Sequence, residues 1–298
     1  MTCGIASPGY RLPDATRLGA VTLQVSDLER SLAYYQDTIG LRLVARGPDR
    51  ASLAPLGESR PLLHLCTAPG TRTARSGRLG LYHFALLVPD RAALGRLVGH
   101  LREVGAHVAS ADHAVSEALY LWDPDGLGVE VYADLPRASW RMRGPELFMT
   151  SERLDLRAVI DAGGGGRWSG LPEGTVIGHM HLHVGDLGAA EAFYHRALGF
   201  DKTAWSYPGA LFLAAGGYHH HLGTNTWGAG SAVAAPDEAR LLEWEVVVPS
   251  PADQDAAARS CEEAGHVVAR TDRGALASDP WGTTLRLVSD TCLTPEQN

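Results

Sequence analysis

The sequence predicts an α+β fold in which four βαβββ units are arranged in two halves. Three observations support this prediction: an internal duplication, a repeated order of strand, helix and further strands, and turn motifs that recur at matching places. At 298 residues the chain is long enough for two domains with separate hydrophobic interiors. Its 45% hydrophobic and 20% charged residues are typical of globular proteins.

The duplication joins two segments that align without a gap at an offset of 159 residues, LGAVTLQVSDLERSLAYYQDTIGL from residue 18 and IGHMHLHVGDLGAAEAFYHRALGF from residue 177. Each segment begins with alternating residues that indicate a strand. From Asp27 and Asp186, which occupy N-cap positions, apolar residues follow at helical spacing. Gly40 and Gly199 then stand where a C-cap glycine ends a helix.

Two further units follow the same plan. LYHFALLVPD precedes a helical segment that ends near Gly105, and LEWEVVVPSP precedes one that ends near Gly265. The DPDG turn at Asp123 matches the DPWG turn at Asp279. We therefore predict an N-terminal domain, 1–135, with units at about 17–67 and 79–134, and a C-terminal domain, 176–298, with units at about 176–227 and 240–290.

The segment 136–175 is expected to link the two domains, because it is rich in Pro, Arg and Gly. Its middle, SERLDLRAVIDA, predicts one short amphipathic helix, and the glycines at 163–166 are its loosest point.

Charge and composition limit the partners and the compartment. The net charge of -8 and the pI near 5.9 argue against nucleic acids, which require clustered cations, and favour small molecules or proteins. No apolar run approaches the ~20 residues of a membrane span, and MTCGIASPGY lacks the order of a signal peptide. We expect a cytoplasmic protein in which Cys3, Cys66, Cys261 and Cys292 are free thiols. Symmetric self-association would be usual for such a chain.

Repeated four times and marked by DLxxxxxFY and DPDGxxxE, this plan resembles the vicinal oxygen chelate superfamily, over nearly the whole chain apart from the linker and termini. Within that superfamily the chain is most similar to two-domain extradiol ring-cleaving dioxygenases of the catechol 2,3-dioxygenase type. The resemblance implies that paired units curl their sheets into cups and that a cup holds one metal ion. Because this fold also hosts isomerases and antibiotic-resistance proteins, the function must be argued from the site.

The resemblance also implies where metal ligands stand, on the first and the last strand of a unit. The first-strand positions of the four units are Ala20, His83, His179 and Glu243. The last-strand positions are near His64, at Glu130, near His220 or His221, and at Arg286. Ala20 cannot bind a metal and Arg286 would repel one, so we expect units one and four not to form a metal site. His64, which lies in unit one, is therefore interpreted as a structural residue.

His83, His179 and Glu130 together make a set of two histidines and one carboxylate. This set is the facial triad of non-haem Fe(II) oxygenases, and Mn(II) has overlapping ligand preferences. A rival is zinc, which also binds histidines spaced as His179 and His181 are on a strand.

The triad draws on both halves of the chain, whereas similar enzymes keep the whole site in the C-terminal half. We therefore predict that units two and three pair to form the metal cup, and that units one and four form an inert one. Pairing within each half would instead separate His179 from His83 and Glu130. Ring nitrogens of His83 and His179 more than roughly 5 Å apart would exclude shared ligation through ~2.1 Å bonds.

The stretch HAVSEALYLWDPDGLGVE, which runs from His113 to Glu130, is similar to the extradiol signature. The resemblance gives His113 and Tyr120 hydrogen-bonding roles beside the catecholate and the bound oxygen. It also gives His220 the role of acid-base catalyst. On an alternating strand His219 and His221 would face the other way, and we expect them to support the strand or the rim.

These observations predict an Fe(II)-dependent extradiol dioxygenase that takes a catechol-like aromatic and O2 as its substrates. Two alternatives remain: a glyoxalase-type isomerase or lyase, which would favour four ligands with two glutamates, and a non-catalytic small-molecule-binding protein. Neither nucleic acid nor membrane is an expected partner.

Overall fold

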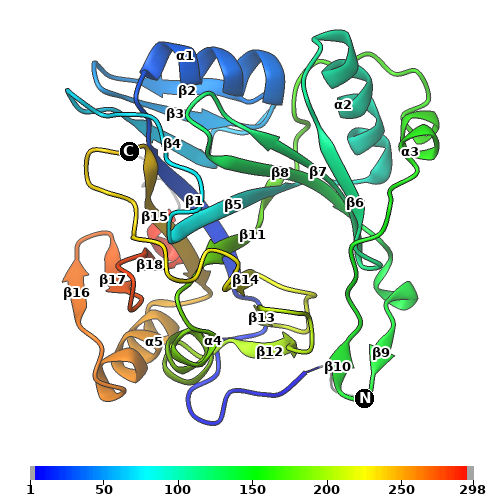
Figure 1. The fold of residues 1–298 in the computed structure, drawn as a ribbon. Coiled ribbons are helices and arrows are strands. Elements are labelled where there is room, and N and C mark those ends of the chain that lie inside the picture. The colour runs from blue at the N-terminus through cyan, green and yellow to red at the C-terminus, as the bar shows by residue number, and fades with distance from the viewer. Residues whose placement is uncertain (1–3, 294–298) are drawn as a thin grey trace.

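The computed structural model describes residues 4–293, and two eight-stranded sheets form its framework (Figure 1). In spatial order, the first sheet consists of β16 (Val268–Thr271), β17 (Gly274–Ser278), β18 (Thr284–Ser289), β15 (Arg240–Val248), β1 (Arg17–Gln24), β4 (Leu63–Cys66), β3 (Arg50–Ala54) and β2 (Arg42–Arg46). The second consists of β12 (Asp201–Ala204), β13 (Ala210–Ala214), β14 (Leu222–Asn225), β11 (Val176–His183), β5 (Gly80–Leu87), β8 (Gly128–Asp134), β7 (Ser116–Trp122) and β6 (Ala109–Asp112).

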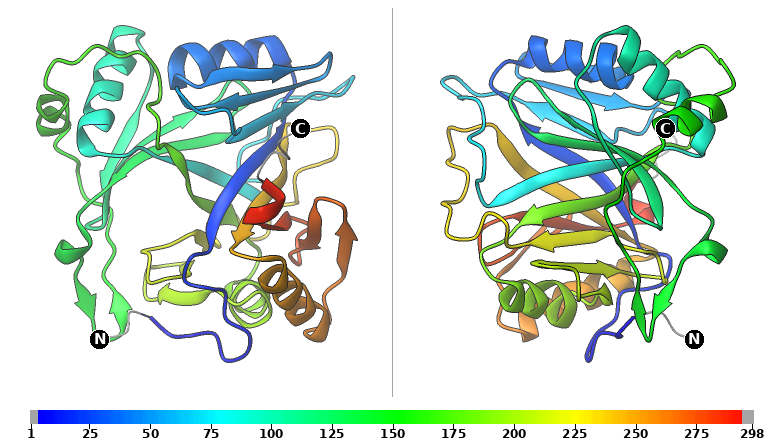
Figure 2. Two further views of the ribbon diagram at one scale, coloured as in Figure 1. Left: turned by 180° about the vertical axis from the view of Figure 1, so that it is seen from behind. Right: turned by 45° about the vertical axis from the view of Figure 1, so that its right-hand side comes forward.

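Each large sheet combines one unit from each half of the chain. Units one and four meet where β1 pairs antiparallel with β15, and units two and three meet where β5 pairs antiparallel with β11. Both sheets are strongly curled (Figure 2). The predicted α+β fold and the predicted pairing of units are confirmed, and pairing within each half is excluded.

The two sheets share one hydrophobic core. Their central strands β1 and β11 contact each other, and Leu23, Phe84, Met180 and Leu182 are fully buried between the sheets. Because side chains alternate along a strand, the histidines of β11 point to the opposite face. The concave face of the second sheet is therefore free to carry polar groups.

Each unit has a helix after its first strand, and the two predicted N-caps, Asp27 and Asp186, are confirmed. The helices are α1 (Leu28–Ala33), α2 (Arg91–Glu103), α4 (Leu187–Ala190) and α5 (Pro251–Glu263). Their caps Asp27, Asp90, Asp186 and Ser250 each accept a hydrogen bond from the backbone N–H three residues on. The sequence did not predict that α1 and α4 continue as π-helical turns, η1 (Tyr34–Ile39) and η3 (Glu191–Ala197). Gly40 ends the first of them with φ +89°.

Residues 136–175 are not an extended linker, because they pack against both halves of the chain. They contain the turn η2 (Arg137–Ser139), the hairpin strands β9 (Met142–Arg143) and β10 (Glu146–Leu147), and the helix α3 (Leu156–Ala162). The Glu146 carboxylate accepts hydrogen bonds from the backbone N–H groups of Trp205 and Ser206. Helix α3 lies on α2, where an added Cβ at Gly95 would come within 2.1 Å of the Val159 carbonyl oxygen.

Three smaller features complete the description. A last turn, η4 (Asp290–Leu293), ends the described chain. Cys66 and Cys261 are free thiols, while Cys3 lies outside the described residues, as does the side chain of Cys292. Within residues 4–293, no helix is both long and apolar enough to span a membrane.

Gly128 is required by the close approach of β8 to β5. A Cβ at this position would lie 2.1 Å from the Tyr82 carbonyl oxygen and 3.0 Å from the His83 Cβ. We expect Gly128→Ala to lower the free energy of unfolding by about 3 kcal/mol, because backbone atoms must shift to relieve the overlap.

The matched control is Gly99→Ala in α2, where an added Cβ meets nothing within 4 Å. It should raise the free energy of unfolding by up to about 1 kcal/mol, because alanine favours the helix. Urea unfolding measures both, and equal effects of the two substitutions would contradict this account of the strand spacing.

Candidate metal centre

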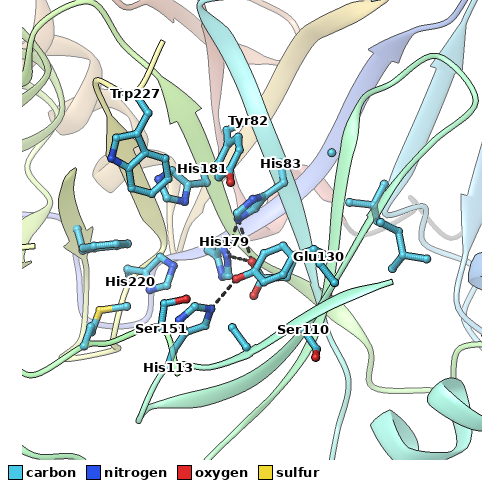
Figure 3. A pocket seen from close by; sticks show the side chains of 18 of the residues that line it. Tyr82, His83, Ser110, His113, Glu130, Ser151, His179, His181, His220 and Trp227 are labelled. Atoms are coloured by element: carbon cyan, nitrogen blue, oxygen red, sulfur yellow. Dashed lines mark hydrogen bonds and ion pairs between the residues drawn. The ribbon is translucent and has the colours of Figure 1, made fainter. Parts of the chain in front are cut away.

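Three neighbouring strands of the second sheet bring together His83, Glu130 and His179. His83 lies on β5, Glu130 on β8 and His179 on β11. In the register of the sheet, His179 lies opposite Ala85, and Ala85 lies beside Glu130. The three side chains therefore project from the same concave face, as Figure 3 shows.

The three ligand atoms form a small triangle. The Glu130 Oε2 lies 2.9 Å from the His83 Nε2 and 3.2 Å from the His179 Nε2, and the two Nε2 atoms are 3.4 Å apart. The distance between the two Nε2 atoms is below roughly 5 Å, the largest separation that allows both to bind one ion through ~2.1 Å bonds. Adjacent corners of an octahedron with such bonds are about 3 Å apart, so the triangle fits one face of a metal's coordination shell.

The charges suit a divalent cation. Burial lowers the pKa of His83 and of His179, which keeps both rings neutral and able to donate a lone pair. Burial by itself would raise the pKa of Glu130, but the adjacent His179 and His83 outweigh it and hold that pKa well below its usual range. Two neutral imidazoles and one carboxylate are a donor set that Fe(II) and Mn(II) accept.

His113 and Tyr120 form a hydrogen-bonded pair beside this triangle. The His113 Nδ1 lies 2.6 Å from the Thr150 carbonyl oxygen, which can only accept, so Nδ1 carries the proton. The His113 Nε2, 2.6 Å from the Tyr120 hydroxyl, then accepts the phenolic proton. Ala114, which follows His113, has φ +65°, a strained value that is unique among the non-glycine residues from 4 to 293.

The run His219 to His221 differs from the sequence expectation. It lies in a bend before β14 and not on a strand, because Gly216 and Gly217 turn the chain with φ +61° and +65°. The strict alternation of side chains expected for a strand is therefore wrong. His220 does line the pocket, with its ring centroid 4.1 Å from that of His179, but His219 and His221 are buried and not at a rim.

A cavity of about 310 Å³ opens above the triangle. Aromatic side chains form much of its wall, namely Tyr82, Tyr120, Tyr207, Phe212 and Trp227. A volume near 300 Å³ with apolar walls and a few converging polar groups is typical of small-molecule sites.

Sequence reasoning missed part of this wall. Met149, Thr150 and Ser151 line the cavity although they belong to the expected linker. These residues have no counterpart in the repeat, so the comparison of units gave no signal for them. The only available signal was the extradiol-like stretch around His113, whose ring needs an acceptor.

Asn225 fixes the protonation of the next histidine on β11. The Trp227 backbone N–H donates to the Asn225 Oδ1 over 3.1 Å, so the Asn225 amide nitrogen faces the His181 Nε2 at 3.0 Å. His181 consequently accepts at Nε2 and carries its proton on Nδ1. Burial lowers the pKa of His181 well below its usual value, so this lining residue is a neutral ring.

The first sheet has an ion pair at the corresponding place. Glu243 and Arg286 occupy the positions of His83 and Glu130, and their side chains form two hydrogen bonds of 2.6 and 2.7 Å. Thr22 lies opposite Glu243, as His181 lies opposite His83 in the other sheet. His64 hydrogen bonds to the Ser52 hydroxyl over 2.8 Å. A guanidinium thus takes the place of a metal ion in this sheet.

Comparisons with known proteins agree with this architecture. Residues 17–131 and 176–287 match the model of the Glyoxalase/Bleomycin resistance protein/Dioxygenase superfamily. The chain is 42% identical over 270 residues to the catechol-2,3-dioxygenase of Bacillus subtilis (strain 168), covering 89% of this chain and 94% of that protein.

Two solved structures share the fold at low sequence identity. A protein of Bacillus subtilis subsp. subtilis str. 168 matches with a TM-score of 0.66 at 14% identity, over 94% of this chain and 86% of that one. Glyoxalase I from Zea mays matches with a TM-score of 0.56 at 18% identity, over 93% of this chain and 94% of that one.

His221 gives the protein a testable pH dependence. Burial, assisted by His219, lowers the pKa of His221 from 6.5 to about 3. Between these values the unfolded chain binds a proton that the folded chain excludes, so the free energy of unfolding falls as the pH falls below 6.5. From pH 7 to pH 5 we expect His221 to account for a loss of about 2 kcal/mol.

Urea unfolding of the wild type and of His221→Phe at both pH values measures this loss. The variant is less stable at neutral pH, since the Ala215 N–H loses its acceptor. When the pH is lowered from 7 to 5, the free energy of unfolding of the variant should nevertheless fall by less than that of the wild type. Equal losses in the two proteins would show that His221 is not buried as a neutral ring.

Proposed function

We propose that this chain, which belongs to the Glyoxalase/Bleomycin resistance protein/Dioxygenase superfamily, is an extradiol dioxygenase that cleaves a catechol-like aromatic with O2. The observation that carries the proposal is the triangle of His83, His179 and Glu130 at the base of an aromatic-walled cavity. The 42% identical relative named catechol-2,3-dioxygenase supports the same reaction class. The product would be a ring-opened hydroxymuconic semialdehyde.

His83, His179 and Glu130 would hold Fe(II), or Mn(II) as its closest substitute. When bound, this ion supplies Lewis acidity toward the two substrate oxygens and open positions for the diol and O2. The three protein ligands lie on strands of one sheet and are buried, so their geometry is set before any ligand arrives. All three residues line the cavity, so a substrate could reach an ion held by them.

The cavity walls orient a flat ring. Phe212 and Tyr207 pack edge to face, and Tyr82 meets Trp227 in the same way. Such surfaces hold an aromatic substrate by apolar contact and by ring-to-ring packing.

Tyr120 is a neutral phenol that donates its proton to His113. Burial, together with the charge of Glu130, raises the pKa of its hydroxyl well above 10, so the phenol stays protonated. His113, held by the Thr150 carbonyl, fixes the direction of that hydroxyl. The Tyr120 oxygen, whose proton is donated to His113, is therefore placed to accept a hydrogen bond from a hydroxyl group of a substrate in the cavity.

His220 is the proposed proton-transfer residue. Burial lowers its pKa well below 6.5, so the ring is neutral and has a lone pair that can accept a hydrogen bond from a substrate hydroxyl. Its ring lies against that of His179 and lines the same cavity, so a substrate in the cavity would lie beside it.

The alternative of a glyoxalase-type isomerase is less well supported. That reaction would favour four protein ligands with two glutamates, whereas the cluster at the cavity base has two histidines and one glutamate. Glu243, the residue at the position equivalent to His83, is engaged by Arg286 in the other sheet. A non-catalytic binding protein, in turn, would have no use for the hydrogen-bonded His113 and Tyr120 beside the triangle.

Anaerobic loading with Fe(II), followed by catechol and oxygen, tests the function. We expect the yellow absorbance of a ring-cleavage product and one iron per chain. His83→Ala should lose iron and at least about 99% of the rate, because several kcal/mol of charge stabilisation disappear with the ion.

His64→Ala is the matched control, since His64 stands at a ligand-like position in the first sheet. It should keep both the iron and the rate of the wild type. If the wild type binds iron and produces no colour with any of several catechols, the proposed reaction is wrong.

A further inference from the structure

His219 links the pocket to the carboxylate of Asp134 at the end of β8. Its Nε2 lies 2.9 Å from the Asp134 Oδ1, and its Nδ1 lies 2.7 Å from the Nδ1 of His220. The His219 ring is fully buried, so water does not compete for either nitrogen. A chain of two hydrogen bonds therefore runs from Asp134 to the pocket.

The direction of each proton in this chain follows from elementary chemistry. A carboxylate oxygen can only accept, so the His219 Nε2 donates to Asp134. If this is the only proton on the His219 ring, its Nδ1 has a lone pair, and the facing Nδ1 of His220 carries the shared proton. The His220 ring is left with a bare Nε2 on its far edge, and Figure 3 shows that ring directed into the pocket beside His179.

We propose that Asp134 and His219 are positioning residues that hold His220 as the Nδ1-protonated tautomer, with the lone pair of Nε2 turned toward the cavity. An isolated neutral imidazole can carry its proton on either nitrogen. The pair from Asp134 to His219 removes this choice, so His220 presents an acceptor to the substrate in every molecule. The catalytic part of this inference rests on the proposed function, whereas the tautomer does not.

The surroundings hold the pair in one geometry. The Tyr218 hydroxyl donates to the same Asp134 Oδ1 over 3.2 Å and shares a 2.7 Å hydrogen bond with the Tyr132 hydroxyl. The Thr203 hydroxyl donates to the His219 carbonyl oxygen over 2.7 Å. Fully satisfied buried networks of this kind specify a single arrangement of their side chains.

Nitrogen NMR of the full-length, metal-free protein, labelled with 15N in its histidines, tests the tautomer directly. Long-range proton–nitrogen spectra should show the Nδ1 of His220 protonated and its Nε2 unprotonated, with the opposite pattern for His219. His220→Gln identifies the signals. A protonated Nε2 on His220 in the wild type would overturn the inference, whether or not the protein cleaves catechols.

Kinetics of the iron-loaded enzyme test the consequence. His219→Leu removes the acceptor for the His220 Nδ1–H, and we expect kcat to fall about 100-fold with KM nearly unchanged, because substrate binding is intact and proton transfer is not. His219→Asn keeps a side-chain oxygen that can accept from His220, and it should recover part of kcat.

The same two substitutions at the exposed His107 are the matched controls and should leave both constants unchanged. If both His219 variants lower kcat equally while unfolding shows them folded, the hydrogen bond to His220 is not what matters, and the inference fails. If His219→Leu does not fold, the wild-type spectra alone decide. Loss of ring cleavage in the wild type would refute only the proposed function.

Discussion

The antiparallel pairing of β5 with β11 is the interaction on which the candidate site depends. It joins the second unit to the third across the two halves of the chain, and its register places His181 opposite His83 and His179 opposite Ala85. The parallel pairing of β5 with β8 then adds Glu130 next to Ala85. A slip of one residue in either pairing would turn the ligands into the hydrophobic core, because the faces of a strand alternate. The buried Phe84, Met180 and Leu182 on the other face hold the register against such a slip.

The first sheet shows what the same architecture does without a metal site. Its central pair, β1 with β15, repeats the geometry, but Glu243 and Arg286 meet where His83 and Glu130 meet in the second sheet. The buried guanidinium of Arg286 needs a partner of opposite charge, and the partly buried carboxylate of Glu243 supplies it. In the second sheet the carboxylate of Glu130 has only neutral rings beside it, which leaves the negative charge available to a cation. The two sheets therefore differ at equivalent positions. The first has an ion pair between Glu243 and Arg286, and the second has three residues that can bind a metal ion.

The sequence allowed the four units, the helix caps Asp27 and Asp186 and the pairing of units from different halves to be predicted, because the units could be aligned position by position. Ala20 and Arg286 excluded two units, so the remaining ligands had to meet across the halves. Features that are not repeated in the four units could not be predicted from their alignment. The bend at His219 to His221 follows from the two glycines before it, and the walls from Met149 to Ser151 come from a segment that has no second copy. The proton directions around His181 and His220 depend on contacts between strands, which no alignment of units contains.

The central claim is that one metal ion binds between strands from the two halves of the chain. Crystals of the iron-loaded protein, measured at the iron absorption edge, test it most directly. The account predicts one anomalous peak per chain, within bonding distance, ~2.1 Å, of the Nε2 atoms of His83 and His179 and of a Glu130 oxygen, and no peak at the pair of Glu243 and Arg286. A peak bound by His181 and His183 instead, or iron held by residues of one half alone, would contradict it.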